Sequence, residues 1–245
     1  MTEIPAPPWR KTRKVSALRT VLSRDLIVAT GLRLLDAEGL DALSMRRVAQ
    51  ELGTGPASLY AHVANKEELL DLMYDEVMGE IRVPEPEPER WLEQIRELAL
   101  DAFRVFNAHA DIARVGLAGI PTGPNALRVA EGQLAIMLAG GVPARAASLM
   151  IDRLGLYICS DAYENSLYIN RQRESGKDLA SFLGEFFGQI GAFYRALPAD
   201  RFPNIVAQVD TLMAADGAER FEFGLDLLLR GLISHVLEAG PTTKG

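Results

Sequence analysis

Cysteine is nearly absent from this chain of 245 residues, since Cys159 is its single copy. One cysteine forms no disulfide within the chain, and the first nine residues lack the apolar stretch of a secretory signal, so we expect a cytoplasmic protein. Long apolar runs are also lacking, because Asp226, Arg230 and His235 interrupt even the stretch 225–237. A membrane span needs roughly 18 uninterrupted apolar residues. We therefore expect a soluble protein without a membrane partner.

Histidine is scarce as well, with three copies. His109 and His235 have no second ligand at metal-binding spacing, so ordinary surface or core roles are favoured over a metal site. An enzyme is the main alternative class, because helical bundles hold di-metal or haem centres through inward carboxylates and histidines. The chain lacks a Glu-x-x-His pair, a histidine near Cys159 in sequence, and a glycine-rich phosphate loop. We expect no catalytic residues, no metal and no cofactor.

A surplus of positive charge is missing too, because the net charge is −7. The distribution is more informative than the total. Residues 1–70 hold ten Lys/Arg and eight Asp/Glu, whereas residues 71–245 hold 16 Lys/Arg and 25 Asp/Glu. Only the N-terminal part therefore suits contact with a phosphate backbone.

Helical periodicity is abundant, and 48% of the residues are apolar, enough for a substantial core. After a basic, proline-containing segment at 1–22, which we interpret as a flexible arm, Ser23 is a plausible N-cap of a helix that ends at Glu38 and Gly39. Ser44 caps a second, short helix, and Gly53 supplies a turn. Pro56 opens a third helix that carries residues 57–63, and a capping-box relative at 65–68 opens a fourth.

The stretch 83–90 alternates proline with acidic residues, which excludes helix and marks a boundary. Beyond it, periodicity and Gly/Pro punctuation predict helices near 89–108, 110–118, 124–140, 143–174, 178–195, 202–214 and 217–238. No convincing strand is found. We predict an all-α protein with an N-terminal helix-turn-helix domain and connecting helix at 23–82 and a C-terminal helical domain at 89–240.

Two short helices joined by a glycine turn and packed on a first helix present the second helix's outer face, which fits a major groove. Val48, Ala49, Leu52, Leu59 and Val63 are the expected packing residues. Three such helices are also a common structural unit, so the pattern alone leaves a purely structural role open.

Residues 43–53 (LSMRRVAQELG) and 57–70 (ASLYAHVANKEELL) closely resemble the DNA-binding domain of the TetR family. A weaker resemblance to the tetracycline repressor branch extends through Trp91, 121–127 and 221–231. The resemblance implies a homodimer whose recognition helices bind the two halves of a palindromic double-stranded DNA operator. It also implies that a small organic effector, bound in the C-terminal domain, releases the DNA.

Carried over by position, Arg46 resembles a base-reading arginine, with a phosphate contact as the alternative. The resemblance further implies DNA contacts at Ser44, Thr54, Ser58, Tyr60, Ala61, His62 and Lys66. For Tyr60 and His62 the alternative is a half-buried surface role. The basic arm is expected either to follow the DNA or to remain a solvated tail. A non-DNA adaptor built on a degenerate domain is a further alternative, disfavoured by the joint presence of Arg46, Tyr60, His62 and Lys66.

The same resemblance places the family's metal-binding histidine at Gly116, a nearby threonine at Gly119, and drug-contacting residues at Leu98 and Ala102. Gln133 and Glu164 match family residues. We therefore expect an effector other than magnesium–tetracycline. The residues predicted to contact the effector are Leu98, Ala102, Phe106, Gly116, Gln133, Met137, Leu156, Tyr157, Asp161 and Glu164. For the apolar ones, plain core is the alternative, and for Asp161 and Glu164 it is a solvated helix face.

The dimer is expected to form through the helices near 145–174 and 217–238. Along the last helix, Phe221, Leu225, Leu228, Leu232 and Val236 recur at spacings of three or four, a stripe suited to a bundle seam. The sequence does not specify the effector, the operator or the target genes, nor whether transcription is repressed or activated.

Overall fold

The computed structural model describes residues 22–117 and 122–239, and in these ranges every regular element is a helix. This confirms the all-α class. The basic arm at 1–21, Gly119 and the end of the chain from 240 lie outside the described residues. Within the described residues, no helix is long and apolar enough to cross a membrane.

The first four helices form a compact group that we call the head: α1 (Arg24–Glu38), α2 (Met45–Glu51), α3 (Pro56–Leu59) and α4 (Lys66–Gly79). Side chains of Ser23, Ser44 and Asn65 each accept a hydrogen bond from the backbone N–H three residues on, at 3.2, 3.1 and 2.8 Å. These are the caps that the sequence predicts, and each satisfies an N–H that the helix leaves unpaired.

The third helix, α3, is shorter than predicted. The regular helix α3 ends at Leu59, and residues 60–62 form a turn, whereas the sequence predicted a helix through residue 63. The carbonyl oxygen of Leu59 accepts hydrogen bonds from both His62 N and Val63 N, at 2.9 and 3.0 Å. The chain therefore turns inward there and buries Val63 in the head.

The remaining elements form the body: η1 (Pro88–Arg90), α5 (Trp91–Ala108), η2 (Ala110–Ile112), α6 (Ala113–Gly116), α7 (Pro124–Ala139), α8 (Ala144–Ser175), α9 (Leu179–Arg195), α10 (Pro203–Ala207), α11 (Val209–Ala214) and α12 (Gly217–Ala239). Two predicted helices were wrong in detail. The segment 110–118 is a 3-10 turn followed by four helical residues, and the segment 202–214 is split at Gln208.

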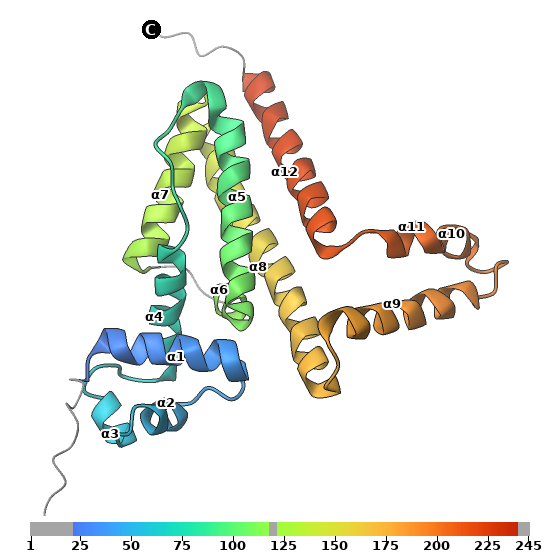
Figure 1. Cartoon of the computed structure of the whole chain (residues 1–245). Helices are drawn as coiled ribbons and strands as arrows, with labels where there is room; N and C mark the ends of the chain where they lie inside the picture. Colours follow the sequence, from blue (N-terminus) through green and yellow to red (C-terminus); the bar gives the residue numbers. More distant parts are fainter. Residues whose placement is uncertain (1–21, 118–121, 240–245) are drawn as a thin grey trace, which may run out of the picture.

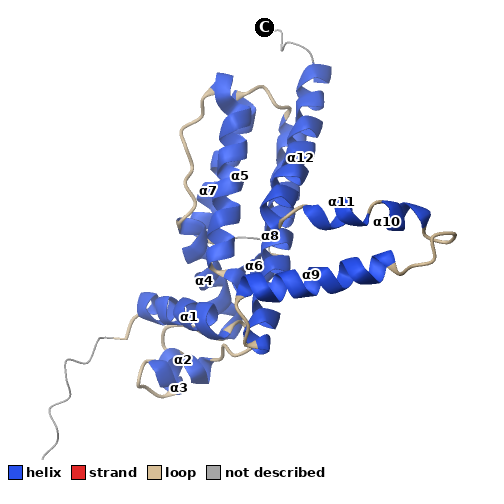
Figure 2. Cartoon of the chain, turned by 45° about the vertical axis from the view of Figure 1, so that its right-hand side comes forward, coloured by secondary structure: helices blue, strands red, loops and turns tan. Residues whose placement is uncertain are grey.

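Helices α5, α7, α8 and α12 run roughly along the long axis of the molecule, with the head at one end (Figure 1). Helices α9, α10 and α11 project sideways from the body, as both views show (Figure 2). We call these three helices the arm, which is distinct from the basic arm predicted at the N-terminus. The non-helical stretch before α5 is held by Gln94, which is 1% exposed. Its amide donates to Glu85 O at 2.8 Å and accepts from Glu87 N at 2.9 Å.

Three of the five residues of the apolar stripe predicted on α12 as a dimer seam pack in the subunit's own core, whereas Leu228 and Val236 are half-buried. Phe221, Leu225 and Leu232 are at most 1% exposed. Phe221 stacks on Phe103 of α5 and on Tyr157 of α8, with ring centroids 3.8 and 5.1 Å apart. The expectation for these residues was wrong because the same helical face that fits a seam also packs against α5 and α8.

Candidate nucleic-acid interface and effector site

The α2–α3 pair is held by a closely packed apolar contact. Val48, Ala49, Leu59 and Val63 are at most 1% exposed, and Leu52 is half-buried. Burial of the inner face fixes which side chains point away from the head. Tyr60 is 53% exposed, and the other outward residues are Arg46, Ser58, Ala61 and His62. These five residues, which we call the outer face, are all available to a partner.

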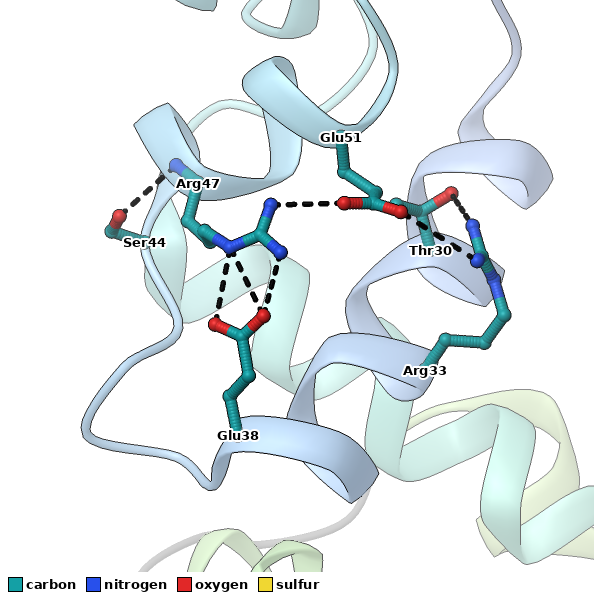
Figure 3. A network of polar contacts seen from close by, with 6 residues as sticks. All are labelled: Thr30, Arg33, Glu38, Ser44, Arg47 and Glu51. Atoms are coloured by element: carbon teal, nitrogen blue, oxygen red, sulfur yellow. Dashed lines mark hydrogen bonds and ion pairs between the residues drawn. The ribbon is translucent and has the colours of Figure 1, made fainter.

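Two consecutive arginines on α2 have different surroundings. Arg47 Nη2 lies 2.6 Å from Glu38 Oε1 of α1, and its Nη1 lies 3.0 Å from Glu51 Oε2 (Figure 3). Glu51 also lies near Arg33, whose second guanidinium nitrogen donates to Thr30 Oγ1 at 3.3 Å. Arg46 is exposed and has no ion-pair partner among the described residues. Its charge is therefore uncompensated locally.

The Arg47 network is also visible in the acid–base properties of the head. The hydrogen bond and charge of Arg47 lower the pKa of the Glu38 carboxyl below its ordinary value. The two carboxylates in turn raise the pKa of Arg47. Arg47 thus connects α1 to α2 within the head, whereas its neighbour points outward.

Three further DNA contacts were predicted, at Ser44, Thr54 and Lys66. Ser44 is exposed, but its hydroxyl caps α2 by accepting from Arg47 N. Thr54 is half-buried, and its backbone N–H donates to Ala49 O at 2.9 Å. Lys66, half-buried at the start of α4, has no ion-pair partner among the described residues. That these residues touch DNA stays a prediction.

Helix α4 connects the head to the body, and one of its residues was missed by the sequence analysis. Tyr74 lies against Phe106, with ring centroids 5.7 Å apart. A Cβ atom added at Gly116 would meet Tyr74 Cε2 at 2.7 Å and Cys159 Sγ at 3.0 Å. The Tyr74 ring therefore occupies the space that a side chain at position 116 would take. Burial and the neighbouring Cys159 raise the pKa of Tyr74, and burial raises that of Cys159 to about 12.

Two neighbouring cavities lie beside α4. One of about 180 Å³ is bounded by α4, α6 and the start of α7, and its lining includes Tyr74, Gly116 and Ala126. The second, of about 430 Å³, lies where the head meets the body, and its lining includes Lys66 and Arg114. Any molecule in either space would contact α4 directly.

The predicted effector contacts fall into two groups, of which the first is mostly apolar and the second is polar. Leu98, Ala102 and Phe106 of α5 and Gln133 and Met137 of α7 are buried, each at most 7% exposed. Gly116 lines the cavity of about 180 Å³, which the other members of this group do not line. Leu156 is 36% exposed. That these residues contact an effector stays a prediction.

The polar group lies where α8 meets the start of α12. Tyr157 Oη donates to Phe221 O at 2.8 Å, and Glu164 forms an ion pair of 2.9 Å with Arg220. Burial and the nearby Asp161 raise the pKa of Tyr157 to about 12. Burial and the charge of Glu164 raise the pKa of Asp161. The two acids are thus half-buried and close to each other, rather than on a fully solvated face.

A larger cavity of about 730 Å³ lies at the base of the arm and was not anticipated. Aromatic and aliphatic residues of α8, α9 and α11 line it, together with Asn107, Asn165 and Arg220. Periodicity did not reveal it, because its walls come from helices that meet only after the turn between α8 and α9.

His109 is a junction residue rather than an isolated one. Its Nδ1 lies 3.0 Å from Asp36 Oδ2 of α1, and its Nε2 lies 3.1 Å from Glu80 Oε1 at the end of α4. These carboxylates raise the pKa of His109. In the described residues no group of three or more His, Cys, Asp or Glu is arranged to hold a metal ion.

Comparison with known proteins agrees with this geometry. Residues 27–73 match the family of bacterial regulatory proteins, tetR family, and residues 83–236 match the family tetracyclin repressor-like, C-terminal domain. An HTH-type transcriptional regulator of Saccharopolyspora erythraea is 30% identical and covers 93% of this chain and 92% of its own length. The HTH-type transcriptional repressor DrrR1 of Streptomyces coeruleorubidus is 30% identical over 91% of this chain and 82% of its own.

Among solved structures, ActR from Streptomyces coelicolor without ligand has a TM-score of 0.78 at 42% identity, covering 89% of this chain and 98% of that chain. ActR in complex with actinorhodin gives the same TM-score and identity, with 88% and 98% covered. The two relatives from Saccharopolyspora erythraea and Streptomyces coeruleorubidus are transcriptional regulators, and ActR is a TetR family protein. The family matches, the coverage and the outward presentation of the α2–α3 face together lead to one conclusion: the chain belongs to the TetR family of bacterial regulatory proteins.

Proposed function

We propose that this ligand-responsive, DNA-binding repressor acts as a homodimer on a two-half-site operator and is released by a small organic effector other than magnesium–tetracycline. The observation that carries the proposal is the outer face of the head. It presents Arg46 without a local counter-charge, flanked by hydroxyl, phenol and imidazole groups. An arginine of this kind is suited to bidentate contact with guanine in a major groove.

The dimer is supported by an exposed apolar surface on α8 and α12, which we call the α8–α12 face. Leu149, Phe223 and Leu227 are 58%, 67% and 57% exposed. A groove of about 750 Å³ between the two helices has Leu149, Leu227 and Gly231 in its lining. Contiguous apolar surface of this kind marks interaction sites. A twofold dimer through it presents two heads, as a two-half-site operator requires.

An effector without metal is supported by position 116. The resemblance places the metal-binding histidine of the tetracycline repressor branch at this glycine, where an added Cβ atom would lie 2.7 Å from Tyr74 Cε2 and 3.0 Å from Cys159 Sγ. ActR, the structurally similar protein, has been solved with actinorhodin and with (S)-DNPA. An organic molecule accommodated among the helices of the body is therefore the effector class we propose.

The route of release runs through α4. Its N-terminal end carries Lys66, which lines the cavity where the head meets the body, and its middle carries Tyr74 against α6. An effector shifts this equilibrium only when it binds the released state more tightly, and moving the population from almost fully bound to almost fully free takes about 5.5 kcal/mol of differential binding.

The proposal is tested by gel shifts with the promoter region upstream of the protein's own gene. We expect a specific complex that weakens as the salt concentration rises, because each contact of a basic side chain with a phosphate releases counterions. A thermal-shift screen of organic compounds, with and without magnesium, then supplies candidates for release. Release by magnesium–tetracycline at ordinary inducing concentrations, or strict metal dependence of every hit, contradicts the proposed effector class.

A further inference from the structure

Besides α4, a second set of contacts joins the head to the body, at the C-terminal end of α1. The backbone N–H of Leu40, just after α1, donates to Asp111 Oδ2 of η2 at 2.8 Å. Asp111 is only 8% exposed. Its other oxygen, Oδ1, accepts from Asn170 Nδ2 of α8 at 3.3 Å. One buried carboxylate therefore lies between the backbone of the head and the long helix of the body.

A second contact reinforces the first. Arg173 Nη2, one turn further along α8, donates to the carbonyl oxygen of Asp36 in α1 at 2.8 Å. Gly39 ends α1 with φ of +82°, and a Cβ atom there would lie 3.1 Å from Asp111 Oδ2. The turn after α1 is thus fitted closely to the carboxylate, in a backbone conformation that favours glycine.

The arrangement makes the end of α1 hard to move on its own. A buried carboxylate depends on its hydrogen-bond donors because water no longer solvates it. Any rotation of α1 away from α8 removes the Leu40 donor from Asp111. The same helix α8 carries Tyr157, Asp161 and Glu164 between about two and four turns before Asn170. A motion of α8 at those residues can therefore reach the head without passing through α4.

We propose that Asp111, Asn170 and Arg173 are positioning residues that tie α8 directly to α1 and set the angle at which each head presents its outer face. We call these contacts the α1–α8 tether. The inference rests on the proposed function, since head angle matters for a dimer on two half-sites. Two heads held at a fixed angle match one spacing of half-sites, and heads free to rotate tolerate others.

The first test measures the tether itself by hydrogen exchange on the full-length protein. Asp111 is buried and its replacement risks misfolding, so the informative variants are Asn170→Ala and Arg173→Ala. Arg171→Ala is the matched control, because Arg171 is an exposed arginine of the same helix end whose guanidinium lies 5.8 Å from the Phe186 ring of the arm. We expect exchange of the Leu40 amide to rise about tenfold in the first two variants and to stay unchanged in the control.

The second test asks whether the tether positions the head. The probe is the duplex that wild-type protein selects from a random-sequence pool, with versions whose half-sites are one base pair closer or further apart, and a single half-site. Wild type and Arg171→Ala should lose about tenfold or more in affinity when the spacing changes. Asn170→Ala and Arg173→Ala should lose much less, while their affinity for the single half-site stays at the wild-type value.

Wild-type spacing preference in both tether variants, with faster Leu40 exchange, overturns the inference and reduces these contacts to local structure. Unchanged exchange overturns it as well. Failure of wild type to select any duplex contradicts the proposed function instead, and the hydrogen-exchange comparison still decides whether the tether holds α1.

Discussion

At the scale of single residues, the two neighbouring arginines of α2 differ in their ion-pair partners and in their exposure. Arg47 is committed to Glu38 and Glu51 within the head, and Arg46 is exposed without such partners. Charge that is already paired contributes little to DNA affinity, whereas an uncompensated guanidinium is ready for a base or phosphate.

We therefore predict that Arg46→Ala weakens specific binding by about 1–3 kcal/mol and relaxes preference at one base pair, with an unchanged melting temperature. Arg47→Ala is the matched comparison and should lower the melting temperature of the head, because it frees two carboxylates. Fluorescence anisotropy with selected and random duplexes, alongside thermal melts, separates the two. Wild-type affinities of Arg46→Ala for both duplexes would mean that Arg46 does not read bases.

His109 gives the head–body junction a pH dependence. Its neighbours are Asp36 of α1 and Glu80 at the end of α4, with Asp111 of η2 two residues along the chain. Because the pKa of His109 is raised in the folded protein, the stabilisation is fully present below the unfolded value of about 6.5. It is lost as the pH rises through the higher folded value.

We predict that the difference in melting temperature between wild type and His109→Gln is largest near pH 6 and shrinks towards pH 9. His62→Gln, which changes an exposed histidine of the outer face, should show no such trend. Thermal melts across this range provide the measurement. A difference that grows with pH would show that the two carboxylates do not hold a charged imidazole.

The close approach of Tyr74 favours a glycine at position 116, whatever the effector is. Gly116→Ala places a methyl group 2.7 Å from Tyr74 Cε2, so the variant should lose about 1–3 kcal/mol of unfolding free energy. Gly155→Ala in α8 meets nothing within 4 Å and should gain about 0.5–1 kcal/mol. Urea unfolding compares them. Equal stability of Gly116→Ala and wild type would mean that Tyr74 yields freely.

At the scale of helices, α12 shows that an apolar stripe in the sequence does not identify the surface against which it packs. The regularly spaced Phe221, Leu225 and Leu232 face the subunit's own core, and the neighbouring positions Phe223 and Leu227 are exposed. Both faces of α12 are apolar enough to pack, and only the folded arrangement separates the internal face from the external one.

This division predicts the outcome of charge substitutions. Leu227→Glu or Leu149→Glu should give a monomer at micromolar concentration, because a dimer would bury an unpaired carboxylate. Leu127→Glu is the control, since Leu127 of α7 is 56% exposed and lies away from the α8–α12 face. Analytical ultracentrifugation decides. Persistence of the dimer in both interface variants, with intact folding, would place the interface elsewhere.

Local signals account for what the sequence predicted well. Ser23, Ser44 and Asn65 act as N-caps because capping depends on three neighbouring residues, and the helices of the head follow from them. The contacts of Asp111 with Leu40 and Asn170 span 71 and 59 residues, and no periodic pattern encodes such pairs. For the same reason, Tyr74 beside Gly116 and the cavity at the arm base emerged only from the fold.

At the scale of the whole molecule, shape places the head and the body at separate ends of the long axis. The head, residues 24–79, carries five Lys/Arg and ten Asp/Glu, so DNA binding there depends on the few basic side chains that the outer face presents. Helix α4, the α1–α8 tether and the contact of His109 with Asp36 are connections through which the body can act on that end.

We expect two copies of this head to bind the two halves of one symmetric site. Selection from a random-sequence duplex pool by full-length wild-type protein, followed by sequencing, tests this. An inverted repeat should be enriched, with half-site centres about 34–36 Å apart or a whole multiple of that distance. With the Arg46→Ala variant, we expect the enrichment to be lost, or the base preference at one base pair to change. Recovery of no sequence by wild type, or of a single unpaired half-site, would contradict the expected symmetric site.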